Sequence, residues 1–165
     1  MLDVRFTVAL HILILLSQSP VVLTSEDMAK GVNKNSSYIR KIMANLKKHK
    51  IIENSQGKAN AKLLISKDKL SLWEIYKAVQ NSDVLHVWDV HKTNEEDVLS
   101  RHVGITMERL LTAYDEIVIN KLKQTTLDDV MRILRSEIDS NELADALEEI
   151  RLAKLGLLDS KGYKK

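Results

Sequence analysis

The chain has 165 residues, enough for one domain with an appended element, and 44% of them are hydrophobic, enough to build a core. It contains no cysteine, which excludes disulfides, thiolate metal sites and cysteine-based redox sensing. One proline and five glycines argue against a turn-rich all-β fold, so a mainly α fold is predicted. No run of 18 apolar residues exists, and we therefore expect a cytoplasmic protein with no membrane partner.

The net charge of +2 conceals a basic block in the first half of the chain. Residues 30–69 hold 11 basic and two acidic residues, whereas residues 91–165 hold 12 basic and 15 acidic residues. A local basic block is typical of nucleic-acid binding. A solvated lysine surface is the alternative explanation, and the pattern of the neighbouring residues has to decide between the two.

The first predicted helix runs from about Val4 to Ser17, with Asp3 as its N-cap. Pro20 ends the segment because proline cannot continue a helix. This helix is apolar nearly all round, so it must be covered on more than one side.

The stretch that begins at Thr24 has the pattern of a helix-turn-helix. Thr24 and Asp27 have the spacing of an N-cap and its reciprocal partner. Gly31 is predicted to end the first helix in a left-handed conformation. Asn35 or Ser36 then caps a second helix, whose apolar residues recur at three- and four-residue spacing. Its other face carries donors and bases, which is typical of a helix that enters the DNA major groove.

Different residues of this face suit different DNA contacts. Arg40 can reach a guanine edge, and the serines at the helix N-terminus suit phosphate. The lysines add salt-dependent affinity without reading sequence. The predicted DNA-contacting residues of the helix are Asn35, Ser36, Ser37, Tyr38, Arg40, Lys41, Lys47 and Lys48.

Two short strands, 51–54 and 61–66, are predicted to follow as a wing. Lys58 and Lys62 flank the wing tip, where they can meet phosphate or the minor groove. Ser71 and Glu74 then form a capping box at the start of a helix whose aromatic residues are predicted to be core.

The second half of the chain is predicted to be helical after a connection. Residues 83–104 read as this connection, extended at first and then a polar loop, and a long amphipathic helix follows at 105–122. Its apolar seam either covers its own domain or pairs with a second subunit, and we favour the pairing. The seam residues are Met107, Leu110, Leu111, Tyr114, Ile117 and Val118.

Two further helices complete the prediction. One begins at the capping pair Thr126 and Asp129, and the other runs over 141–155 and stops at Gly156, before a basic tail. The expected organisation is a winged helix-turn-helix domain at 1–82, a connection at 83–104, dimerisation helices at 105–138 and a C-terminal helix with its tail at 139–165.

With these features in place, the chain resembles the Rrf2 family of bacterial winged-helix transcription regulators. The resemblance rests on Arg5-Phe6, Ala9-Leu10, Leu23-Thr24-Ser25-Glu26, Ser37-Tyr38-Ile39-Arg40-Lys41-Ile42, Gly57 and Leu72-Trp73-Glu74-Ile75-Tyr76-Lys77-Ala78-Val79, with a looser fit at His91, Gly104 and 126–130. It implies a homodimer joined by the long helix, bound to a palindromic operator and acting as a repressor. It also implies that Ser36, Ser37, Tyr38, Arg40 and Lys41 face DNA.

The chain departs from the family pattern in three places. Some members hold an iron–sulfur cluster on cysteines of a loop that here reads HKTNEEDVLSRHVG, so no cluster or other cofactor is expected. A wing arginine and a Gly-Gly-Tyr of many relatives are replaced by Gln56 and Asn60-Ala61-Lys62. Residues after about 135 match no part of the family pattern.

Other functions have weaker support in the sequence. No phosphate loop, nucleophile elbow or His-Glu-x-x-His motif is present, so no enzyme is expected. The histidines and acidic residues between 86 and 102 have spacings that fit no compact metal site. The second hypothesis is a winged-helix module that binds a protein and not DNA. The effector is open between a small molecule and a partner protein.

Overall fold

The computed structural model describes residues 4–54, 61–85, 87–88 and 90–157. The elements in this part of the chain are α1 (Arg5–Gln18), α2 (Ser25–Val32), α3 (Ser36–Lys48), β1 (Ile52–Asn54), β2 (Ala61–Leu63), α4 (Leu72–Gln80), α5 (Val98–Gln124), α6 (Leu127–Glu137) and α7 (Ser140–Lys154). The fold is mainly helical with a two-stranded antiparallel sheet, as the sequence predicted.

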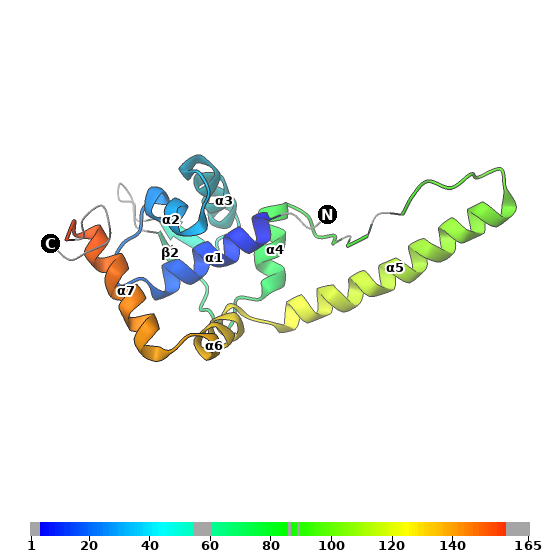
Figure 1. Cartoon of the computed structure of the whole chain (residues 1–165). Helices are drawn as coiled ribbons and strands as arrows, with labels where there is room; N and C mark the ends of the chain where they lie inside the picture. Colours follow the sequence, from blue (N-terminus) through cyan, green and yellow to red (C-terminus); the bar gives the residue numbers. More distant parts are fainter. Residues whose placement is uncertain (1–3, 55–60, 86, 89, 158–165) are drawn as a thin grey trace.

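Helix α1 is the centre of the body, and α2, α3, α4, β2 and α6 all contact it (Figure 1). Its residues Val8, Ala9, Ile12 and Leu13 are buried. The partly buried side chains around the rest of the helix are packed against the same core. An almost uniformly apolar helix is therefore covered on several sides, as predicted.

Three predicted capping boxes are present. In each, a hydroxyl accepts the N3 backbone N–H, and the N3 carboxylate accepts the N–H of the cap residue. The pairs are Thr24–Asp27 at α2, Ser71–Glu74 at α4 and Thr126–Asp129 at α6. The start of α1 differs, because its cap position is Val4, which has no side-chain cap bond. The predicted cap Asp3 lies outside the described residues.

The prediction that Gly31 ends the first helix of the helix-turn-helix is wrong. Helix α2 continues through Gly31 to Val32, and Asn33 takes the left-handed conformation at φ 54°. The backbone N–H of Lys34 donates to the carbonyl of Ala29 at 3.0 Å, which closes the turn. Asparagine tolerates this conformation better than other residues with a side chain, so the helix gains two residues.

The predicted connection was also too long. Helix α5 begins at Val98 and not at 105, because Asp97 caps it by accepting the N–H of Ser100 at 2.7 Å. The first residues of α5 are exposed, including Val98 and Leu99. A sequence pattern that seeks a buried stripe therefore misses them. The extended segment expected near 84–91 forms no strand in its described residues.

The wing is shorter than predicted on its returning side. β1 and β2 pair antiparallel with Glu53 opposite Lys62, and the Leu64 N–H still donates to the carbonyl of Ile51 at 2.9 Å. The strand ends at Leu63 and not at residue 66. The wing tip, 55–60, lies outside the described residues.

Helix α6 belongs to the body that contains the helix-turn-helix, although the predicted division grouped it with the long helix. Leu127 and Met131 are buried in the main core. The Leu127 N–H donates to the carbonyl of Leu70 at 2.9 Å, and the Leu72 N–H donates to the carbonyl of Thr125 at 2.8 Å. These bonds join the start of α6 to the start of α4.

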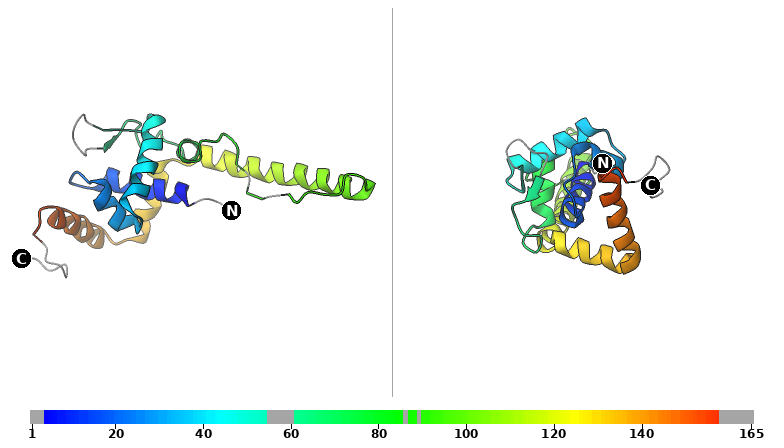
Figure 2. Two further views of the ribbon diagram at one scale, coloured as in Figure 1. Left: turned by 90° about the horizontal axis from the view of Figure 1, so that it is seen from above. Right: turned by 90° about the vertical axis from the view of Figure 1, so that its left-hand side faces the viewer.

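A second, smaller core joins α4 to the C-terminal half of α5. Trp73 and Tyr76 stack with their ring centroids 5.3 Å apart, as part of a cluster with Leu85. Val118 packs against the same cluster. The buried carboxylate of Asp115 accepts the Val87 N–H at 3.0 Å, which holds the connection against α5. The N-terminal half of α5 projects away from the body (Figure 1; Figure 2, left).

The pKa of Asp129 should make stability depend on pH. The Thr126 backbone and hydroxyl bonds hold the pKa of this carboxyl below its ordinary value. A group with a folded pKa below its unfolded pKa stabilises the fold above the unfolded value, and this contribution disappears as pH falls through the folded pKa. Asp129→Asn should therefore lower the melting temperature at neutral pH, and the gap to wild type should close at acid pH, as the pH falls through the folded pKa.

Asp145→Asn is the matched control, because it removes an exposed carboxylate from α7 that has no cap role. Thermal melts by circular dichroism give the comparison. A gap of equal size at both pH values would contradict a role for the ionised cap.

Candidate nucleic-acid interface

The orientation of α3 is fixed by its apolar face. Ile39, Ile42 and Leu46 are at most 1% exposed and lie in the main core. Three buried residues at this spacing leave the helix no freedom to rotate, so its other face must meet solvent. Asn35 caps the helix by accepting the Tyr38 N–H at 2.8 Å, which settles the open choice between Asn35 and Ser36.

Most of the predicted DNA-contacting residues lie on this outer face. Ser36 and Tyr38 are half-buried, and Tyr38 also packs against the core. Lys62 is exposed on β2, whereas Lys58 lies outside the described residues. The exposed residues of the set on α3 and its cap are Asn35, Ser37, Arg40, Lys41, Lys47 and Lys48.

Arg40 is held between the two helices of the motif. Its Nη1 donates to Ser25 Oγ at 3.3 Å and its Nη2 donates to Ser37 Oγ at 3.1 Å. The guanidinium is thus oriented before any ligand arrives, at the exposed surface of α3. This orientation lowers the entropic cost of ordering the side chain when it makes a bidentate contact.

Ser25 is a candidate site residue that the sequence prediction missed. It is the first residue of α2, directly after the Thr24 cap. Its place at the start of α2 could have indicated this role, because the two helices of a helix-turn-helix meet near the N-terminus of the first helix. Ser25 and Arg40 both line a hollow of about 300 Å³ between α2, α3 and β2. Lys47 and Ala61 line the same hollow, so the recognition helix and the wing share one surface.

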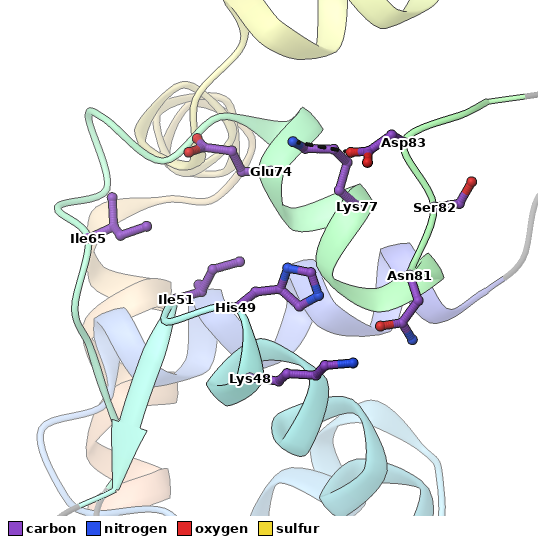
Figure 3. A pocket seen from close by; sticks show the side chains of 9 residues that line it. All are labelled: Lys48, His49, Ile51, Ile65, Glu74, Lys77, Asn81, Ser82 and Asp83. Carbon is purple, nitrogen blue, oxygen red and sulfur yellow. Dashed lines mark ion pairs between the residues drawn. The ribbon is translucent and has the colours of Figure 1, made fainter.

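A larger cavity, of about 460 Å³, lies at the C-terminal end of α3 (Figure 3). The ion pair between Lys77 and Asp83, 3.4 Å long, lies on its α4 side. Lys48 comes from the last turn of the recognition helix, and Asp83 from the start of the connection to α5. Residues from the end of α3 and from the segment that leads to α5 therefore line one cavity. Its lining residues are Lys48, His49, Ile51, Ile65, Glu74, Lys77, Asn81, Ser82 and Asp83.

The Rrf2 family, described as "Iron-dependent Transcriptional regulator", matches residues 2–133. The chain belongs to the Rrf2 family. It is a winged-helix DNA-binding transcription regulator, as its resemblance to that family implied. No described helix of this Rrf2 protein is long and apolar enough to cross a membrane.

Its relatives agree with this assignment. The chain is 30% identical over 135 residues to the Bacillus subtilis protein named "Putative HTH-type transcriptional regulator YwnA", covering 81% of this chain and 99% of YwnA. A solved structure named "putative DNA binding protein" is 28% identical, with a TM-score of 0.63, over 77% of this chain and 98% of the other. CymR of B. subtilis, the global cysteine regulator, shares the fold at 16% identity and a TM-score of 0.57, over 79% of this chain and 96% of CymR.

An iron–sulfur cluster held by cysteine does not fit this Rrf2 chain. The sequence contains no cysteine, so the soft thiolate ligands are missing. Among the described residues, no three histidine, aspartate or glutamate side chains lie together in a way that could hold a metal ion. Gly104 of α5 lets Thr93 of the preceding loop approach the helix, since a Cβ at Gly104 would lie 2.7 Å from Thr93 Oγ1.

Arg40 and Lys47 should have different effects on DNA binding. Arg40→Ala should lower operator affinity while binding to random DNA changes little, because a bidentate base contact discriminates by about 1–3 kcal/mol. Lys47→Ala should weaken both by a similar factor and reduce the salt dependence by about one contact. Fluorescence anisotropy with two duplexes of equal length measures both. An equal loss on both duplexes for Arg40→Ala would rule out base reading.

Proposed function

We propose that this regulator acts in the cytoplasm as a homodimeric repressor on a palindromic operator, without catalytic activity. The observation that carries the proposal is an apolar face of α5 that the described part of its own chain leaves largely exposed. Repression is the role implied by the family resemblance. Binding of two recognition helices to successive major grooves, about one helical turn apart, would explain a palindromic site.

The uncovered face of α5 includes most of the predicted seam. Met107, Leu110 and Tyr114 are 40–46% exposed, and Ile117 is 63% exposed. Leu111 is half-buried, and the Tyr114 ring contacts Trp88 edge-on with centroids 5.9 Å apart. Contiguous apolar surface of this kind is uncommon on monomers. A second copy in antiparallel or crossed arrangement buries it with the same residues on both sides.

Val118 makes the seam serve two purposes. It lies half-buried against Trp73, Tyr76 and Leu85 of its own chain. The C-terminal end of the seam therefore covers its own domain, while the N-terminal part is left for a partner. This division supports both uses that the sequence left open, in different halves of one helix.

Leu110→Glu should dissociate the dimer. Burying a leucine side chain contributes about 1.5–3 kcal/mol, and a symmetric interface contains the residue twice, so the dissociation constant should rise at least about tenfold. Thr112→Glu is the control, since Thr112 is exposed on the opposite side of α5. Sedimentation velocity measures the masses. A dimer that survives Leu110→Glu unchanged would overturn this assignment of the interface.

DNA binding by the dimer should fall steeply with salt, because lysine and arginine contacts release counterions from the duplex. Sequencing the fragments that the protein retains from a genomic pool would reveal whether the site is palindromic. Fragments without two-fold symmetry would refute the operator model. No retention at low salt, together with a co-purifying protein, would favour the protein-interaction module.

A further inference from the structure

The C-terminal helix α7 is an addition to the family domain. The family match ends at residue 133, inside α6, and the relatives are covered over 98–99% of their own lengths by part of this chain. Helix α7 nevertheless folds back from α6 along the side of the body towards α2 (Figure 1; Figure 2, right). It ends at Lys154, next to the first turn of α2.

The contact that joins α7 to α2 is an ion pair at the α2 capping box. Lys154 Nζ donates to Asp27 Oδ2 at 2.5 Å. The same oxygen accepts the Thr24 N–H at 2.8 Å and the Thr24 hydroxyl at 2.7 Å. Burial raises the pKa of Asp27, but the bonds from Lys154 and Thr24 outweigh it and leave the pKa below its ordinary value.

The rest of the α7 contact is shallow. No residue of α7 is buried, and Ile150 is the α7 side chain that packs against the main core as a partly buried hydrophobic residue. A cavity of about 260 Å³ remains between α7 and the body, lined by Leu15, Leu23, Gly31 and Ile150 among others. The ion pair at Lys154 adds a polar contact at the end of α7 to this shallow apolar one.

We propose that Lys154 is a positioning residue for DNA reading, which acts through Asp27 on the first turn of α2. That turn carries Ser25, whose hydroxyl accepts a hydrogen bond from Arg40. Leu23, just before α2, lines both the cavity under α7 and the hollow beside Arg40, so this segment separates the two. An ion pair that fixes the segment from the α7 side keeps Ser25 where it orients the Arg40 guanidinium.

The proposal rests on DNA reading by α3 and not on dimer formation. Lys154→Met removes the charge and keeps most of the side-chain length. It should weaken operator binding about threefold, the effect of a partly exposed ion pair, and leave binding to random DNA within experimental error. Lys154→Arg should restore operator binding, because its guanidinium can still donate to Asp27.

Arg151→Met is the matched control on the same helix. Arg151 is exposed and its Nη1 pairs with Glu148 at 3.3 Å, within α7. The Arg151→Met substitution removes the same charge one turn away and should leave operator binding unchanged. An equal effect of Arg151→Met and Lys154→Met, or an equal loss on operator and random DNA, would show a general charge effect and overturn the proposal.

A double-mutant cycle tests the route through Asp27. Asp27→Asn with Lys154→Met should bind operator no more weakly than Asp27→Asn alone, because the pair acts as a unit. Additive losses would exclude the route. Sedimentation of every variant separates the two proposals, since a change in binding at constant mass belongs to α7 and a change in mass belongs to the α5 interface.

Discussion

The burial of one face of α3 is the constraint on which the rest of this structure depends. Ile39, Ile42 and Leu46 lock the helix onto the body centred on α1. Because three residues per two turns fix the rotation of a helix, the opposite face is exposed without any further interaction. Arg40 and the lysines are therefore presented by packing, and their own contacts only refine the geometry.

The body that supports α3 is itself joined by polar bonds at its edges. The start of α4 and the start of α6 bond to each other through the backbone of Leu70, Leu72, Thr125 and Leu127. Capping boxes fix the first turns of α2, α4 and α6. Helix α5 is different, because half of it extends from this body with apolar side chains exposed. The body buries its own core, whereas this half of α5 is left exposed. A symmetric partner would cover it.

Two separate sets of contacts meet the two ends of α3. At its start, Ser25 of α2 holds Arg40, and Lys154 of α7 contacts the same turn of α2 through Asp27. At its end, Lys48 and the Asp83 connection line one cavity. Changes in α7 and changes in the path to α5 would therefore reach DNA reading through separate contacts.

The local features of this protein follow from its sequence. Helix periodicity, capping pairs and the position of the wing follow from neighbours in the chain, so most element bounds were predicted within one or two residues. The outward face of α3 was also predictable, because the face opposite a buried apolar stripe is exposed to solvent. The error at Gly31 arose because either Gly31 or Asn33 could end the helix. The error at the start of α5 arose because the first residues of that helix are not buried.

How distant segments of the chain meet could be learned only from the three-dimensional structure. Nothing in the spacing of Ser25 and Arg40, 15 residues apart, reveals their hydrogen bond, and Lys154 lies 127 residues from Asp27. The placement of α6 in the core and the contact of Val118 with the cluster at α4 are likewise decided by packing. The physical reason is that local patterns specify which face of a helix is apolar, whereas the partner of that face is chosen by the shape of the whole chain.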